Sequence, residues 1–250
     1  MNEISIVGGG ATGAATLIAL LKKIRKNKFT QKTTINIFEP KSDLGLGLVY
    51  SASLTSILLN TSVGCTTIIA NDNRHFANWL EKQASRWKPL FPEVTTYNLE
   101  SFLPRALCGL YIKDTLNDEL SYVNKDIIQI NHIRQKVTDI KLTSALTKRF
   151  TVFTTSGSYT SDSCVLATGY GQGYSSTYPY LTENKNYFSS PYLCIEQIQK
   201  IHQRARILII GTGLSAIDAA LILKNRNYSP LLATACQTGV NDQGKITKIF

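Results

Sequence analysis

A cluster of glycines close to the amino terminus constrains the fold more than any other feature of the sequence. The run from Ile4 to Val7 is mostly β-branched and apolar, which predicts a short buried strand, and the apolar residues after Gly13 predict a helix. The turn between them is filled by Gly8, Gly9, Gly10 and Gly13. Such a turn lets the backbone approach a pyrophosphate, lets the helix pack tightly on the strand, and presents free helical N–H groups to phosphates.

A second strand follows, with an acidic residue at its end. Ile35 and Ile37 in "TTINIFEP" predict the second strand of a βαβ unit, and Glu39 stands at its carboxyl end. A carboxylate there accepts a hydrogen bond from a ribose 2′-OH and repels a 2′-phosphate, which favours FAD or NAD over NADP at this first site. Gly13 and Glu39 are 26 positions apart, more than the usual gap of about 20, and a long first helix explains the excess. The alternative is an ordinary helix–strand turn with a surface Glu.

The middle of the chain predicts antiparallel strands followed by one more strand of the first sheet. Residues 136–162 alternate with period two, with turns at 143–148 and at Gly157, which predicts a small meander. The phrase "SCVLATGYGQGY" then predicts a buried strand from Cys164 to Ala167, closed by Thr168 and Gly169.

A second nucleotide-binding turn lies roughly 200 residues after the first. Ile207 to Ile210 predicts an apolar strand, the six residues from Gly211 to Ala216 read G-x-G-x-x-A, and a helix is expected over 214–225. Two such turns with an A-T-G strand between them are far more specific than either turn alone.

In this order, the motifs resemble the flavoproteins with two dinucleotide-binding domains, which hold FAD in the first domain and NAD(P)H in the second. The phrases "VGGGATGAA", "FEP", "LGLGLVYS", "LLNTSV", "HFANWL", "FLPRALCGLYI", "VLATGYG" and "LIIGTGLSAIDAAL" are similar to the FAD/NAD(P)-binding proteins related to the N-hydroxylating flavin monooxygenases. The resemblance implies an α/β fold. It consists of a Rossmann-like FAD-binding domain with a β-meander (1–170), a linker (171–204) and an incomplete Rossmann-like NAD(P)-binding domain (205–250).

The same resemblance implies the residues that contact each part of FAD. The pyrophosphate would be held by Gly8, Gly10, Ala11, Thr12 and Gly13, and the adenosine ribose by Glu39. The flavin end would lie near Gly45, Gly47, Leu48, Tyr50 and Asn60. Val137 would meet adenine through its backbone, and Thr168 with Gly169 would close over the cofactor. Tyr50 has the alternative role of a packing aromatic, and Asn60 that of a turn cap.

Two further assignments concern anions. Arg105 in "LPRALCGLY" is expected to reach a phosphate or an anionic substrate, and its alternative is a surface arginine after a proline turn. At the second turn, Gly211, Gly213 and Ser215 are expected to bind NAD(P)H.

Composition narrows the remaining classes of function. The five cysteines and three histidines are scattered, with no C-x-x-C, which disfavours a metal site, a disulfide framework and a flavin disulfide reductase. The net charge of +10 invites a nucleic-acid interpretation, but its densest cluster, between Lys22 and Lys32, suits a solvated helix end, and no nucleic-acid module is recognised. No apolar stretch is long enough to span a membrane and no basic leader precedes the first strand, so a cytoplasmic protein is expected.

These features predict an FAD-dependent oxidoreductase that uses NAD(P)H, and the resemblance implies a monooxygenase hydroxylating a small molecule. Because the cofactor supplies the chemistry, no catalytic residue is nominated. The alternative is a non-catalytic FAD- or nucleotide-binding subunit, or a fragment that needs a partner chain for turnover. A flavin-free NAD module fits the two turns and the A-T-G strand less well. The segment "GKITKIF" is expected to be the second strand of the NAD(P) domain, to be completed by a partner chain or a missing carboxyl-terminal segment.

Overall fold

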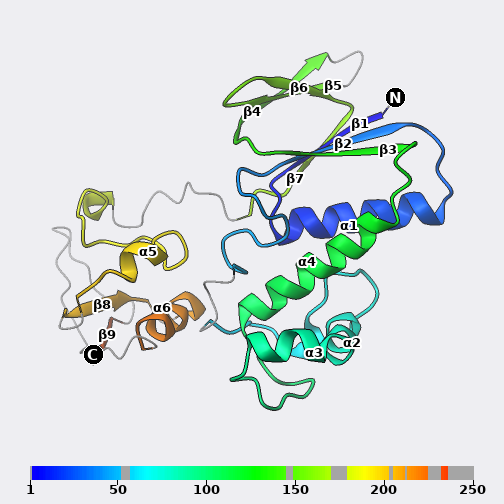
Figure 1. Ribbon diagram of the computed structural model, residues 1–250. Coiled ribbons are helices and arrows are strands. Elements are labelled where there is room, and N and C mark those ends of the chain that lie inside the picture. Colours follow the sequence, from blue (N-terminus) through cyan, green and yellow to red (C-terminus); the bar gives the residue numbers. More distant parts are fainter. Residues whose placement is uncertain are drawn as a thin grey trace.

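The computed structural model describes residues 2–51, 57–144, 149–169, 179–202, 205–211, 213–224 and 232–235 of the chain. It has an amino-terminal part, residues 2–169, and a carboxyl-terminal part, residues 179–235 (Figure 1). The mixed α/β architecture, with a parallel sheet, an antiparallel meander and a second small parallel sheet, confirms the predicted fold class.

The central sheet has four parallel strands in the order β3-β2-β1-β7. They are β1 (Asn2–Val7), β2 (Thr33–Phe38), β3 (Ile128–Ile133) and β7 (Ser163–Leu166). Helix α1 (Ala11–Lys26) connects β1 to β2 and covers one face, where Ile6, Ile35 and Ile37 pack in the same cluster as Leu17 of the helix. Their alternation with polar residues along each strand is what directs these isoleucines to one face.

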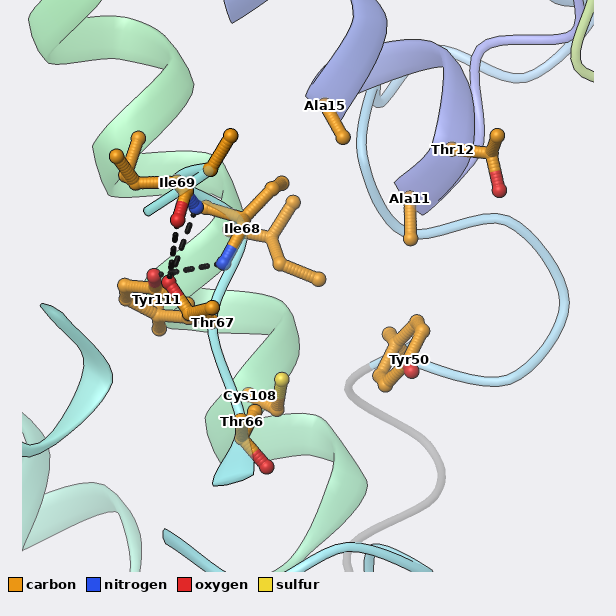
Figure 2. Close-up of a pocket in the computed structure, with 12 residues that line it drawn as sticks. Ala11, Thr12, Ala15, Tyr50, Thr66, Thr67, Ile68, Ile69, Cys108 and Tyr111 are labelled. Carbon is orange, nitrogen blue, oxygen red and sulfur yellow. Dashed lines mark hydrogen bonds between the residues drawn. The ribbon is translucent and has the colours of Figure 1, made fainter. Parts of the chain in front are cut away.

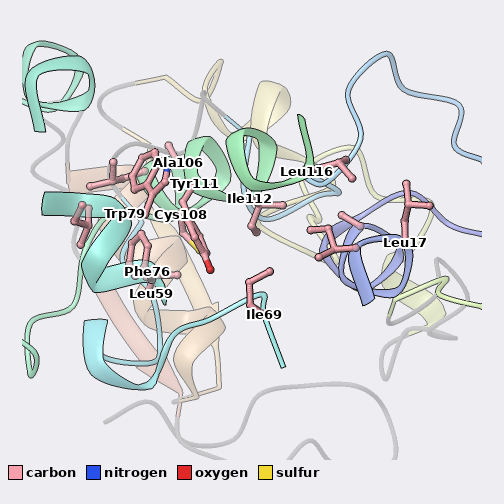
Figure 3. Close-up of a cluster of buried hydrophobic side chains, with 14 of the residues drawn as sticks. Leu17, Leu59, Ile69, Phe76, Trp79, Ala106, Cys108, Tyr111, Ile112 and Leu116 are labelled. Atoms are coloured by element: carbon pink, nitrogen blue, oxygen red, sulfur yellow. The ribbon is translucent and has the colours of Figure 1, made fainter. Parts of the chain in front are cut away.

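Helices fill the space beyond α1. Helix α4 (Arg105–Ser121) packs against α1, and the shorter elements are η1 (Val63–Cys65), α2 (His75–Lys82), α3 (Ala84–Trp87) and η2 (Lys88–Leu90). Figure 3 shows side chains of α4, among them Ile112 and Leu116, between those of α1 and those of α2. None of the helices in the described part of the chain is long and apolar enough to cross a membrane.

The predicted meander covers the opposite face of the sheet (Figure 1). It consists of β4 (Val137–Ser144), β5 (Arg149–Thr154) and β6 (Ser158–Ser161), which pair antiparallel in chain order. Val152 of the meander is fully buried against Val7 and Phe38, and the Phe38 and Tyr159 rings meet edge to face with their centroids 5.2 Å apart.

Strand β7 differs from its prediction as a buried strand. It is the outer strand of the sheet among the described residues, and the side chains of Val165 and Leu166 are 36% and 66% exposed. The apolar run therefore predicted the strand correctly, but the prediction that the strand is buried is wrong. A strand at the edge of a sheet is covered on fewer sides than a central strand.

The carboxyl-terminal part holds the second nucleotide turn. Its elements are η3 (Pro179–Leu181), α5 (Ile195–Ile198), β8 (Ile207–Ile210), α6 (Leu214–Lys224) and β9 (Leu232–Ala235). β8 pairs in parallel with β9, so the prediction of "GKITKIF" as the second strand is wrong. That segment lies outside the described residues. Seven residues separate α6 from β9, close to the usual helix-to-strand connection of about 2 to 6 residues, whereas position 244 is far beyond that spacing.

Candidate dinucleotide-binding site

The turn between β1 and α1 is crowded by two other segments. Gly8 has φ of +102°, a conformation that favours glycine, and its N–H donates to the carbonyl of Phe38 over 3.0 Å. A Cβ atom on Gly8 would overlap the carbonyl oxygen of Ala167 in the A-T-G strand, and one on Gly13 would overlap the carbonyl oxygen of Gly8. The ends of β1 and β7 and the start of α1 therefore meet at one point, as the close-packing role of Gly13 predicts.

Helix α1 points its amino terminus at this turn. Gly10 precedes the helix with extended backbone geometry, and no described side chain caps it or places an acidic group in its first turn. The last turn carries Lys23, Arg25 and Lys26. The N–H groups of Ala11, Thr12 and Gly13 precede the first helical hydrogen bond, donated by Ala14, so they remain available to an anion.

Glu39 at the end of β2 is held in place by the backbone. One carboxylate oxygen accepts from the Gly9 N–H and the other from the Lys41 N–H, each over 3.1 Å. Nε2 of His132 lies 2.9 Å from the Glu39 carbonyl oxygen. A carboxylate has about four acceptor positions, so two of them remain for a ribose hydroxyl.

A second glycine-rich loop lies against the first. Gly45, with φ of +91°, donates its N–H to the carbonyl of Gly9 over 2.7 Å. A Cβ atom on Gly10 would stand 3.4 Å from the Cα atom of Gly47, whose carbonyl accepts from Lys41 Nζ over 3.1 Å. The structure thus brings together Gly8, Gly10, Gly13, Glu39, Gly45 and Gly47, which the sequence had placed in one site.

A pocket of about 370 Å³ opens beside the start of α1 (Figure 2). Three predicted site residues line it, Ala11, Thr12 and Tyr50, facing residues that sequence reasoning did not identify. The latter are Thr66, Thr67, Ile68, Ile69 and Ala70 of one loop, here called the wall loop, together with Ala15 of α1 and Cys108, Tyr111 and Ile112 of α4.

Tyr111 anchors the wall loop. Its hydroxyl accepts from the Ile68 N–H over 3.0 Å and lies 2.9 Å from Nδ1 of His75, while its ring packs on Phe76 with centroids 4.8 Å apart. Burial raises the pKa of Tyr111 and lowers the pKa of His75. The tautomer of the His75 ring sets which of His75 and Tyr111 donates, and the Tyr111 oxygen accepts from the Ile68 N–H in either case.

Cys108 also lines the pocket, but its thiol is unreactive at neutral pH. Burial raises the pKa of this thiol to about 12, partly offset by the nearby Arg105 guanidinium. Since the thiolate is the nucleophilic form, Cys108 acts at neutral pH as a small apolar wall residue. Four cysteines in the described part of the chain, Cys65, Cys108, Cys164 and Cys194, are free, and no group of described side chains has the composition of a metal site.

The other predicted FAD contacts lie around the pocket rather than in its lining. Leu48 is 40% exposed in the loop before Tyr50, and Asn60 is exposed beyond the single bridge between Leu58 and Pro104. Val137 starts β4 and packs beside the Val7–Phe38–Val152 cluster. Thr168 and Gly169 follow β7, and the Cα atom of Thr168 lies against Gly8. Their contacts with FAD stay predictions.

Arg105 is buried and ion-paired, which excludes its alternative role as a surface arginine, while its contact with a phosphate or an anionic substrate stays a prediction. It is 9% exposed, and its guanidinium binds the carboxylate of Asp218 and the carbonyl of Leu58. Its Nε therefore faces the amino-terminal part and its Nη2 faces the carboxyl-terminal part. Sequence reasoning could not find this ion pair, because Arg105 and Asp218 are 113 positions apart in the chain.

The second turn is more open than the first. Gly211 has φ of +110°, and the carbonyl of Gly213 accepts from the Ala216 N–H over 2.9 Å as α6 begins. A Cβ atom on either glycine would meet no described atom within 4 Å. Ser215 is exposed at the start of α6, and Thr212 lies outside the described residues.

Three kinds of comparison match this chain to known proteins. A family model described as FAD-NAD(P)-binding matches residues 5–171. The uncharacterized protein YdhS of Escherichia coli is 28% identical over 224 residues, which cover 88% of this chain and 39% of YdhS.

Solved structures share the fold at low sequence identity. L-lysine 6-monooxygenase from Pseudomonas syringae gives a TM-score of 0.57 at 18% identity, covering 94% of this chain and 53% of that one. The lysine monooxygenase NbtG from Nocardia farcinica gives 0.56 at 15%, covering 96% and 58%. The FAD-bound cadaverine monooxygenase DfoA from Erwinia amylovora gives 0.54 at 14%, covering 93% and 50%. The chain thus spans about half the length of these proteins, and these likenesses concern the fold.

Proposed function

Because the chain belongs to the FAD-NAD(P)-binding family, we propose that it is an FAD-dependent oxidoreductase that consumes NAD(P)H and hydroxylates a small molecule as a monooxygenase. The observation that carries the proposal is the convergence at the first turn. Glycines without room for a Cβ atom, an uncapped helix terminus and a carboxylate fixed by backbone N–H groups all meet there. That combination suits a pyrophosphate joined to an adenosine ribose.

Each part of FAD has residues of suitable chemistry near the first turn. The N–H groups of Ala11, Thr12 and Gly13 would bind the pyrophosphate, and the free acceptor positions of Glu39 would bind the ribose. The pocket beside α1 is near the lower end of the usual range of about 300 to 1,000 Å³ for ligand pockets, so it suits one portion of FAD rather than the whole. Its apolar lining by Ile68, Ile69 and Ile112 would exclude water from a bound ring system.

Each glycine turn would bind one of the two cofactors. Residues 1–170 would form the FAD-binding domain, 171–204 a linker, and 205–250 part of an NAD(P)-binding domain. FAD, when bound, supplies the redox chemistry. The chain contributes phosphate binding, orientation and shelter from water. Gly211, Gly213 and Ser215 would bind the NAD(P)H phosphates at the start of α6.

The first test is the visible absorption spectrum of the purified chain and its titration with FAD. We expect flavin bands, and we expect Gly10→Val to weaken FAD binding at least tenfold, about 1.4 kcal/mol, because a side chain would fill the space between Gly10 and Gly47. The matched control is Gly157→Val, since Gly157 has no described atom within 4 Å of its Cβ position. A colourless protein that fails to take up FAD would overturn the proposal. The names of the solved relatives make lysine and cadaverine the first substrates to try.

An alternative function is supported by the carboxyl-terminal part. Among the described residues its sheet has two strands, β8 and β9, fewer than a complete nucleotide-binding domain of this type has. The chain would then be a non-catalytic FAD- or nucleotide-binding subunit, or a fragment, that gains turnover with a partner chain. The rate of flavin reduction separates the two functions.

A further inference from the structure

The first residue of α4 connects the two parts of the chain. The backbone N–H of Arg105 donates to the carbonyl of Ile57 over 2.7 Å, and its Nε donates to the carbonyl of Leu58 over 2.9 Å. Its Nη2 reaches across to Oδ2 of Asp218 on α6 over 3.0 Å. This one residue therefore binds the amino-terminal part through its backbone N–H and its Nε, and the carboxyl-terminal part through its Nη2.

The Arg105–Asp218 pair is buried and has a third member. Arg105 is 9% exposed and Asp218 is 5% exposed. The hydroxyl of Tyr192 donates to the same carboxylate oxygen, and the Tyr192 ring lies 5.5 Å from the guanidinium carbon of Arg105. Burial and the hydrogen bond to Asp218 raise the pKa of Tyr192, so its hydroxyl keeps the proton that it donates.

An apolar contact runs beside the ion pair. Ile57 belongs to the amino-terminal part by sequence, yet its side chain is fully buried in a cluster with Ile198, Ile222 and Leu223 of the carboxyl-terminal part. Arg105 holds the backbone of Ile57, so the ion pair and the apolar contact are fixed by one residue.

We propose that Arg105 and Asp218 form a positioning pair that sets the place of the second nucleotide turn relative to the first pocket. Each residue lies on a helix that reaches a site. α4 carries Cys108 and Tyr111 of the pocket one and two turns after Arg105, and α6 carries the second G-x-G turn about one turn before Asp218. Helices are stiff, so a contact between them transmits position to both ends.

The catalytic consequence rests on the proposed function, whereas the contact itself does not. Hydride transfer requires a nicotinamide held close to a flavin, and a misplacement of about 1 Å can cost roughly a hundredfold in rate. Removing one member of a buried ion pair leaves the other charge uncompensated, so the docked arrangement should be strongly disfavoured.

The first experiment measures docking without any cofactor. In the full chain, Ile57→Cys places a thiol at the fully buried contact, and its alkylation rate is read by mass spectrometry. Adding Asp218→Asn should raise that rate at least about tenfold, which corresponds to about 1.4 kcal/mol, and Asp218→Glu should recover part of the protection. The matched control is Asp114→Asn, which removes an ion pair to Arg86 within the amino-terminal part. An unchanged rate with Asp218→Asn would overturn the proposal.

Hydrogen exchange distinguishes undocking from unfolding in the same variants. The amides that pair β8 with β9 should exchange as slowly in the Asp218→Asn protein as in the unmodified chain. If their protection is lost together with that of α6, the pair is needed for folding of the carboxyl-terminal part, and the positioning role is refuted.

The second experiment uses the FAD-loaded chain. Asp218→Asn should slow flavin reduction by NADPH at least about tenfold while changing the dissociation constant of FAD by less than about twofold. An equal loss of FAD affinity would instead assign Arg105 to the first cofactor and overturn the positioning role. If the unmodified chain shows no flavin reduction, the proposed function fails, and the alkylation rates still decide whether the pair positions the two parts.

Discussion

The Glu39 carboxylate shapes the first turn and, in the proposed function, would also bind the adenosine ribose. Its carboxylate accepts from the Gly9 and Lys41 N–H groups, so it shapes the first turn before any nucleotide arrives. Its remaining acceptor positions are those that a ribose hydroxyl would use. With FAD bound as proposed, this side chain would link the shape of the first turn to the position of the ribose.

We expect Glu39→Ala to weaken FAD affinity by about 1 to 3 kcal/mol, the usual loss for a charged hydrogen bond. Titration of the protein with FAD, followed by flavin fluorescence, measures the change. Glu93→Ala serves as the control, since Glu93 is exposed and remote from the first turn in sequence. FAD retention equal to that of the unmodified chain would remove Glu39 from the site.

His75 makes stability depend on pH. Burial lowers its pKa from the ordinary value of 6.5, with Lys22 and Lys82 acting in the same direction and Asp72 and Glu119 opposing them. The unfolded chain then binds the proton at higher pH than the folded chain, so the free energy of unfolding falls as pH drops below about 6.5. Protonation would also place a donor against the Tyr111 hydroxyl.

Urea unfolding at pH 7.5 and at pH 5.5 tests this effect. The unmodified chain should lose more stability between the two values than His75→Asn, which has no titrating group at this position. Equal losses in both proteins would show that His75 does not titrate differently in the folded and unfolded chains.

Among single residues, the sequence predicted those whose type is unusual at their position, such as glycines in a turn and a carboxylate at the end of a strand. Gly13 completes the glycine pattern, Glu39 ends the next strand, and the structure shows both at the first turn. Tyr111 and the wall loop could not be found this way. Their residue types are common, and the hydroxyl of Tyr111 meets the Ile68 N–H 43 positions away in the chain.

Helix α4 is tightly packed at its centre. A Cβ atom on Gly109 would overlap the carbonyl oxygen of Tyr50, so the helix and the loop that ends at the pocket touch backbone to backbone. Alanine in a helix is ordinarily favoured over glycine by about 1 kcal/mol, but here the overlap should reverse the sign.

We therefore expect Gly109→Ala to destabilise the fold by about 1 to 3 kcal/mol, measured as the free energy of unfolding in urea. Gly157→Ala, in an open turn between β5 and β6, should stay within about 0.5 kcal/mol of the unmodified chain. A stabilising effect of Gly109→Ala would mean that the loop at Tyr50 moves aside at little cost.

Element by element, prediction succeeded where local pattern and burial agree. β1, β2, β8, α1 and α6 were expected because an apolar strand, a glycine turn and a helix follow one another twice. Helix α4 was not, since its buried residues lie on nearly every side and leave no clear period. β9 was missed because a four-residue run of Leu, Ala and Thr gives a weak strand signal beside the more β-branched "GKITKIF".

At the scale of the whole molecule, the proposed function makes turnover depend on the second turn. Gly211 and Gly213 are open on the side where a Cβ would stand, and the described sheet around them has two strands. We expect this chain alone to bind FAD but to be reduced slowly by NADH or NADPH, and a longer form or a partner chain to restore turnover. Imperfect placement of the nicotinamide by about 1 Å can cost roughly a hundredfold.

Anaerobic stopped-flow bleaching of the flavin measures that rate. Gly213→Val tests the second turn, and Gly157→Val serves as the matched control away from both turns. Fast reduction by either nucleotide, abolished by Gly213→Val, would show that the carboxyl-terminal part suffices for hydride transfer.

The strand order also determines when, during translation, the proposed cofactor site can form. β1 is made first, yet its neighbour β7 begins at Ser163, more than 150 residues later. At about 5 to 20 residues per second, the ribosome needs roughly 8 to 30 seconds to supply it. Ribosome-arrested chains ending before Ser163 should fail to retain FAD, whereas chains with residue 169 outside the exit tunnel should retain it. Until β7 is synthesised, one edge of β1 is unpaired and can pair with another chain. We therefore expect FAD binding and protection from aggregation to begin at the same late stage of synthesis.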